Sequence, residues 1–173
     1  DSRVPANEIT GTLPGEIFVH RNIANMVIHT DMSMLSVLDY SVNILEVTDI
    51  VVCGHYGCGG IIAAMGNQPL GIVENWLRHI KDVYRLHQRE LDAIKDLEQR
   101  GNRLVELNVI EQVFDLTKTS IVQNAWLNKK KLSVHGLVYD IKNGILNDLG
   151  ASVSSTIELP QYYKVDKKTK SKK

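Results

Sequence analysis

Hydrophobic residues recur along the chain with two spacings, one typical of helices and one typical of strands. From Ser33 the apolar positions follow the i, i+3, i+4 spacing of a helix, and Ser33 itself is the expected N-cap. Residues 49–54 instead form a continuous apolar run rich in β-branched side chains, which predicts a strand buried on both faces of a parallel sheet. Helical spacing predicts further helices over residues 61–65, 72–84, 104–116 and 121–127.

Three other segments have strand character. Residues 16–20 predict a short strand, and residues 132–139 alternate between the two faces of a strand. Residues 151–157 are expected to return antiparallel to residues 132–139 across the turns at Asn143-Gly144 and Leu149-Gly150. This order predicts an α/β fold, with helices flanking a mostly parallel central sheet that has an antiparallel edge strand. Three or four strands make a thin sheet, and the sequence starts at Asp1 rather than Met. We therefore expect at least one further strand upstream of Asp1.

The composition is that of one globular domain. The 173 residues are 43% hydrophobic and 23% charged, which excludes a disordered chain, a collagen-like fibre and a disulfide-stapled miniprotein. No apolar run approaches the ~18 residues of a membrane span, so we expect a soluble protein. We assign residues 1–160 to a single α/β domain and residues 161–173 to a Lys-rich tail, which we expect to be disordered and solvated. Two cysteines suit a reduced, intracellular chain, and we expect it to be cytoplasmic, with a mitochondrial location left open.

The segment from Gly54 to Gly60 (Gly-His-Tyr-Gly-Cys-Gly-Gly) lies where a strand meets a helix, the edge at which open α/β sheets bind ligands. It has three interpretations. Its glycines and the following helix N-terminus suit an anion, although the Lys-Ser/Thr pair of a phosphate-binding loop is missing. It is also compatible with a purely structural turn. Finally, an imidazole and a thiolate three positions apart, on His55 and Cys58, suit zinc.

A catalytic zinc site has three protein ligands and a water, so a third ligand must come from elsewhere. Asp1 is followed two residues later by Arg3, and the two side chains suit a bidentate ion pair or an ordinary surface pair. Cys53 lies inside the predicted strand, where we expect it to pack in the sheet.

Several motifs together resemble the β-class carbonic anhydrases of bacteria and fungi. The resemblance spans almost all of residues 1–157, and it rests on residues 1–5, 15–25, 54–60, 75–80, 106–113 and 133–136. It implies zinc-dependent, reversible hydration of CO₂ to bicarbonate and a proton, with Zn²⁺ held by Cys, His and Cys. His55 and Cys58 would be two of these ligands. The first Cys would lie two residues before Asp1, outside the sequence, together with the strand that leads into it and an N-terminal helical arm.

The resemblance implies roles for other residues as well. Asp1 would accept a hydrogen bond from the reacting water and orient it, while Arg3 holds Asp1 away from the metal. With that ion pair broken, Asp1 would itself become a ligand and close the site. Tyr40 and Gly59 would line the apolar substrate pocket, the alternative for Tyr40 being an ordinary aromatic of the helix core.

The resemblance also implies regulation and assembly. Arg21 and Tyr139 match two of three residues that bind a second, inhibitory bicarbonate in some bacterial relatives. A homodimer, often paired into a tetramer, is the family's unit, and we expect no nucleic-acid or membrane partner. His79 and His87 are interpreted as surface or interface residues. Two alternatives remain: a related scaffold that is inactive because its first zinc-ligand Cys is absent, and an anion- or nucleotide-binding α/β module.

Overall fold

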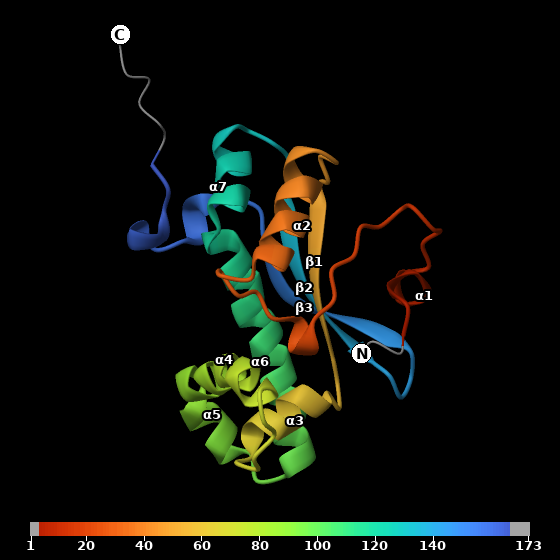
Figure 1. Cartoon of the computed structure of the whole chain (residues 1–173), viewed down its shortest axis with the longest axis vertical. Coiled ribbons are helices and arrows are strands. Elements are labelled where there is room, and N and C mark those ends of the chain that lie inside the picture. The colour runs from red at the N-terminus through yellow and green to blue at the C-terminus, as the bar shows by residue number, and fades with distance from the viewer. Residues whose placement is uncertain (1–3, 167–173) are drawn as a thin grey trace.

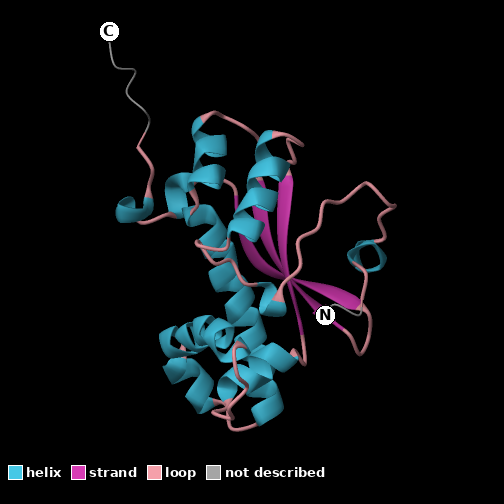
Figure 2. Cartoon of the chain, viewed as in Figure 1, coloured by secondary structure: helices cyan, strands magenta, loops and turns pink. Residues whose placement is uncertain are grey.

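A three-stranded sheet forms the centre of the computed structural model, which describes residues 4–166 apart from the side chain of Glu158. The strand order is β1-β2-β3, from β1 (Asp49–His55), β2 (Ser133–Asp140) and β3 (Ile145–Val153). β1 and β2 are parallel, and β3 returns antiparallel to β2, as Figure 2 shows. The expected α/β architecture with an antiparallel edge strand is therefore confirmed.

The antiparallel strand starts earlier than expected. The turn at Asn143-Gly144 leads directly into β3, whereas Leu149 and Gly150 lie inside it. Gly136 pairs with Ala151 but the next residue of β2 pairs with Asp148, so two residues of β3 bulge out of the ladder. Gly150 has a φ of +67°, a conformation that favours glycine, and this residue makes the bulge rather than the turn predicted for it.

The helix α6 (Leu97–Lys118) covers one face of this sheet and contacts all three strands. In Figure 1 it runs along the sheet, with α3 to α5 gathered at one end and α2 and α7 at the other. Its buried face includes Leu104, Val105, Val109 and Val113, which form the centre of the core. The other helices are α1 (Ala6–Thr10), α2 (Met32–Asn43), α3 (Gly59–Met65), α4 (Val73–Leu86), α5 (Gln88–Ala93) and α7 (Ser120–Leu127), with short 3₁₀ turns η1 (Ile23–Asn25), η2 (Thr156–Glu158) and η3 (Gln161–Tyr163).

Burial along β1 differs from the prediction. Val52 and Gly54 are buried against α6, but Val51 on the other face is 48% exposed and Cys53 is exposed as well. The strand is thus buried on one face only within residues 4–166, and the expectation that Cys53 packs inside the sheet is wrong. Alternation of this kind is the pattern of a strand with one face covered.

Two local predictions also fail. Residues 16–20 form no strand, because within the described part of the chain no neighbouring strand pairs with their backbone. The N-cap of α2 is Asp31 rather than Ser33: its carboxylate accepts hydrogen bonds from the backbone N–H groups of Ser33 and Met34.

The C-terminal part of the described chain lies against the helical layer. Gln123 of α7 donates a hydrogen bond to the Tyr163 carbonyl and accepts one from the Val165 N–H. Residues 161–166, assigned to the basic tail from the sequence, therefore continue the folded structure. Among residues 4–166, no helix has the length and apolar character that crossing a bilayer requires.

Candidate functional site

The turn between β1 and α3 has a compact, well-bonded backbone. β1 ends at His55, and Cys58 is the N-cap residue of α3. The Tyr56 N–H donates to the Tyr139 carbonyl of β2 at 3.1 Å, which extends the sheet ladder by one residue. Gly57 has a φ of +67°, which lets the chain reverse within the turn. The predicted site residues at positions i and i+3 are therefore held at the carboxyl end of a sheet strand.

The ring of His55 is oriented by the residue that follows it. Its Nδ1 atom lies 2.9 Å from the Tyr56 carbonyl oxygen. In the tautomer that binds a metal through Nε2, the proton is on Nδ1, which then donates to this carbonyl. Metal-binding histidines are commonly oriented by such a bond to the other ring nitrogen.

The Cys58 thiol is buried and faces the imidazole. Burial alone would raise its pKa, but the hydrogen bond with His55 and those from the backbone of Ile61 and Gly60 at the start of α3 more than compensate. The net result is that the pKa of Cys58 is lowered, which favours the thiolate needed to bind a metal.

These two side chains fit two positions of a zinc site. An imidazole nitrogen and a thiolate sulfur that face each other are the donor types zinc prefers. Within residues 4–166, no cluster of three or more His, Cys, Asp or Glu side chains has the geometry to hold a metal ion. A site with three protein ligands at this turn would therefore need a donor besides His55 and Cys58.

A side chain of α6 contacts the same turn. The Tyr56 hydroxyl donates a 2.7 Å hydrogen bond to Oε1 of Glu106. Burial, followed by this bond and the charge of the carboxylate, raises the pKa of Tyr56 to about 12, so the phenol keeps its proton. The sequence pattern does not predict this contact, because it joins residues 50 positions apart.

The segment around η1 packs against the two ends of the turn. A Cβ atom at Gly60 would lie 2.8 Å from Cγ2 of Ile23, and one at Gly54 would lie 3.2 Å from Oδ1 of Asn25. The Asn25 side-chain nitrogen is buried without a hydrogen-bond partner. Residues 23–25 therefore form one wall beside the turn.

The other predicted site residues do not all lie at the turn after β1. Asp1 and Arg3 lie outside the described residues. Gly59 is the first residue of α3 and follows Cys58 directly, and a Cβ atom built on it would meet no described atom within 4 Å. This open space is consistent with the predicted position of Gly59 in a substrate pocket. Tyr40 is on α2, 47% exposed, with its ring centroid 5.8 Å from that of Phe18, and is therefore not the helix-core aromatic considered as its alternative.

The two residues of the expected bicarbonate site have different surroundings. Tyr139 is the register partner of His55 across β1 and β2, so it lies beside the turn that follows β1. Arg21 donates a 3.0 Å hydrogen bond to the Val4 carbonyl. The two histidines interpreted as surface or interface residues lie away from the turn. His79 is exposed on α4, and Nε2 of His87 lies 2.9 Å from Oε1 of Glu111 on α6.

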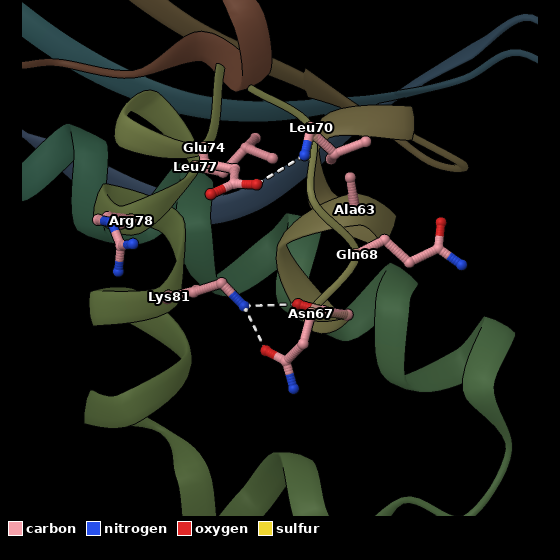
Figure 3. A pocket seen from close by; sticks show the side chains of 9 residues that line it. Ala63, Asn67, Gln68, Leu70, Glu74, Leu77, Arg78 and Lys81 are labelled. Atoms are coloured by element: carbon pink, nitrogen blue, oxygen red, sulfur yellow. Dashed lines mark hydrogen bonds between the residues drawn. The ribbon is translucent and has the colours of Figure 1, made fainter. Parts of the chain in front are cut away.

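A small cavity of about 230 Å³ lies between α3 and α4, at the end of α3 away from Cys58. Figure 3 shows Lys81 reaching across it to the chain that follows α3. The Lys81 ammonium donates to the Gly66 carbonyl at 2.6 Å and to Oδ1 of Asn67 at 3.3 Å. The bond to Gly66 pairs a backbone carbonyl at the C-terminal end of α3, so Lys81 has a structural role in this cavity.

Comparison with known proteins gives consistent results. A family model described as carbonic anhydrase matches residues 1–146. A carbonic anhydrase of Emericella nidulans is 56% identical over 149 residues, which are 86% of this chain and 65% of that protein. The crystal structure of a β-carbonic anhydrase from Aspergillus fumigatus aligns with a TM-score of 0.82 at 42% identity, covering 87% of this chain and 72% of that one.

A tetrameric β-carbonic anhydrase from Sordaria macrospora aligns with a TM-score of 0.84 at 40% identity and covers 89% of this chain and 78% of its own. The match with the Emericella protein covers less than two thirds of that protein's length, namely 65%.

Proposed function

Because the chain belongs to the β-carbonic anhydrase family, we propose that it catalyses the reversible hydration of CO₂ to bicarbonate and a proton, using zinc bound at the turn after β1. The observation that carries this function is geometric: one short turn between β1 and α3 carries both the His55 imidazole, oriented by the Tyr56 carbonyl at 2.9 Å, and the buried Cys58 thiol. The family match covers both residues, and they are the types of side chain that bind catalytic zinc.

Zinc, when bound, supplies a Lewis acid that lowers the pKa of water from ~15.7 to about 7 and so makes a nucleophile available at neutral pH. His55 would bind it through Nε2, since its Nδ1 is engaged by the Tyr56 carbonyl. Cys58 would bind as the thiolate. The third ligand is the cysteine that the family resemblance implies two residues before Asp1.

Other residues would handle the water and the substrate. By the family resemblance, Asp1 would accept a hydrogen bond from the reacting water and orient it toward CO₂, and Arg3 would hold the Asp1 carboxylate away from the metal. Open space at Gly59 supports a substrate position at the start of α3. Tyr40 would form part of the pocket wall.

The active unit would be a homodimer, paired into a tetramer as in the Sordaria relative. Exposed aromatic and aliphatic side chains at Phe18, Tyr40 and Val51 support contact with a second copy. Arg21 and Tyr139 would bind a regulatory bicarbonate, and Arg21→Ala should then weaken bicarbonate inhibition. Two unpaired cysteines suit a reducing compartment, which supports a cytoplasmic or mitochondrial location.

The function is tested on the full-length chain by metal analysis and by stopped-flow CO₂ hydration with a pH indicator. We expect about one zinc per chain, with both zinc and activity lost in His55→Ala and in Cys58→Ser. Cys53→Ser is the matched control, because it alters a nearby cysteine of β1 and should retain both. Bound zinc without CO₂ hydration would indicate the inactive scaffold, an alternative that the relatives named as carbonic anhydrases do not favour. Absence of both zinc and hydration would indicate an anion-binding module.

A further inference from the structure

The turn that carries His55 and Cys58 is held from α6 as well as from the sheet. The Tyr56 hydroxyl donates to Glu106 at 2.7 Å, and the Gly57 N–H donates to Oδ1 of Asn102 at 3.4 Å. Asn102 and Glu106 are four residues apart on α6 and therefore lie on the same face of this helix. Two consecutive residues of the turn are thus attached to one rigid element.

The Glu106 carboxylate is itself fixed. Its Oε2 atom accepts a 2.7 Å bond from Arg103, so both carboxylate oxygens have partners. Arg103 in turn donates from Nε to Glu90 of α5 at 2.5 Å. The Glu106 side chain is only 23% exposed, which reduces competition from water. A carboxylate with both oxygens bonded is a well-defined anchor for a phenol.

Tyr56 transmits this anchoring to a metal ligand. Its carbonyl oxygen lies 2.9 Å from Nδ1 of His55, so the position of the Tyr56 backbone sets the direction of the imidazole. Gly57, which follows, has no side chain to resist rotation of the turn. The 2.7 Å hydrogen bond from the phenol to Glu106 is therefore the shorter of the two side-chain restraints from α6 on the backbone between the two ligands.

We propose that Glu106 acts through the Tyr56 phenol as a positioning residue for the metal-binding turn, residues 55–58. This role rests on the proposed function, because it concerns the zinc site. Glu106 would not touch the metal or the substrate. Removing a direct hydrogen-bond partner of a metal ligand lowers metal affinity about 10- to 100-fold, and because Glu106 acts one residue further away we expect an effect at the lower end of that range.

The test measures Zn²⁺ affinity of the full-length chain by competition with a chromophoric chelator. We expect Tyr56→Phe and Glu106→Ala each to weaken binding about tenfold. Glu106→Gln should stay closer to wild type, because the amide oxygen still accepts from the phenol. The double variant should be no weaker than Glu106→Ala alone, since both changes break the same link.

Glu111→Ala is the matched control. Glu111 lies on the same helix with the same 23% side-chain exposure and is also ion-paired, but its partner is His87 rather than the turn. It should leave zinc affinity within about twofold of wild type, whatever it does to stability. Free energies of unfolding, measured in urea for every variant, separate loss of folding from loss of metal positioning.

A second readout uses Co²⁺ in place of zinc. The ligand-field and thiolate-to-metal bands should shift in Tyr56→Phe and in Glu106→Ala but not in Glu111→Ala. Unchanged affinity and spectra in the first two variants, with only stability reduced, would overturn the positioning role while leaving the proposed function intact. A wild-type chain that binds no zinc would instead refute the proposed function, and this role with it.

Discussion

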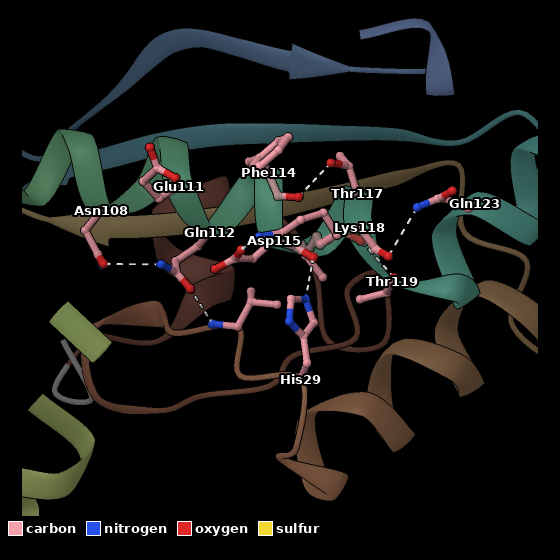
Figure 4. A network of polar contacts seen from close by, with 12 residues as sticks. His29, Asn108, Glu111, Gln112, Phe114, Asp115, Thr117, Lys118, Thr119 and Gln123 are labelled. Carbon is pink, nitrogen blue, oxygen red and sulfur yellow. Dashed lines mark hydrogen bonds and ion pairs between the residues drawn. The ribbon is translucent and has the colours of Figure 1, made fainter. Parts of the chain in front are cut away.

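The side-chain oxygen of Gln112 accepts a 2.7 Å hydrogen bond from the backbone N–H of Val27, a residue 85 positions earlier in the chain. Asn108, one turn away on α6, donates a 2.9 Å hydrogen bond to the Ala24 carbonyl, and Gln112 donates to Asn108 at 3.4 Å. Figure 4 shows these two amides side by side on α6. Both are fully buried, and together they hold the segment that packs beside the turn after β1.

Gln112→Leu should destabilise the protein by about 1–3 kcal/mol, because it leaves the buried Val27 N–H without an acceptor. Urea unfolding gives the free energy. The control is Gln99→Leu, the same substitution at an exposed position of α6, which should change stability by less than about 0.5 kcal/mol. Equal stability of the two variants would show that the buried bond contributes nothing.

Gly54→Ala should also destabilise the folded protein, because the added methyl group would clash with α6. Its Cβ atom would lie 2.6 Å from Cγ2 of Val109 and 3.3 Å from Cγ1 of Val105, both on α6. Overpacking of this kind costs about 1–3 kcal/mol. Gly59→Ala is the comparison: nothing lies within 4 Å of its Cβ atom, and it begins a helix. There we expect no loss of stability, or a gain of up to about 1 kcal/mol, in thermal or urea unfolding.

Asp49 should make stability depend on pH in the acid range. The hydrogen bond from the Thr48 hydroxyl, followed by that from His135, lowers the pKa of Asp49 in the folded state. A carboxyl with a lowered pKa stabilises the fold above its unfolded value, about 3.9, and loses this contribution as pH falls through the folded pKa.

Since the Asp49 side chain is 60% exposed, the contribution should stay below about 1 kcal/mol. The measurement compares free energies of unfolding for wild type and Asp49→Asn between pH 7 and pH 3. Their difference should shrink as pH falls below about 4. In a His135→Gln background the difference should be smaller throughout; a difference independent of pH would contradict this account.

Local patterns predicted much of this fold. The apolar stripes of α4 and α6 and the β-branched run of β1 place each element correctly, because amphipathic spacing depends on neighbours in the sequence. His55 and Cys58 could be singled out for the same reason: their juxtaposition depends on one short turn. The hexapeptide helix α5 has too few turns to show a periodic stripe, and it was not predicted.

What the sequence could not predict depends on distant partners. Residues 16–20 have strand-like composition, but a strand exists only where another strand pairs with it. Gln112 looks like an ordinary polar residue of an amphipathic helix until Val27 is known to lie against it. In the same way, the contact of Glu106 with Tyr56 depends on how α6 crosses the end of β1.

Gln123 should control the order of the last described residues. Its side chain, fully buried in α7, makes a 2.9 Å bond to the Tyr163 carbonyl and a 2.7 Å bond from the Val165 N–H. The Tyr163 ring packs edge-on against Phe114, with the Lys118 ammonium 4.7 Å from the Phe114 centroid and 5.0 Å from the Tyr163 centroid. These ring contacts orient the segment, whereas the two amide bonds fix its backbone.

Gln123→Leu removes both backbone bonds, each of which contributes about 0.5–1.5 kcal/mol, and keeps a side chain of similar size. Hydrogen exchange at the Val165 amide should then be roughly tenfold faster or more, and trypsin should cut sooner after Lys164. Gln161→Leu, a change at an exposed position of the same segment, should leave both rates near those of wild type. If Gln123→Leu protected Val165 as well as wild type does, the aromatic contacts with Lys118 alone would be sufficient to hold this segment on α6 and α7.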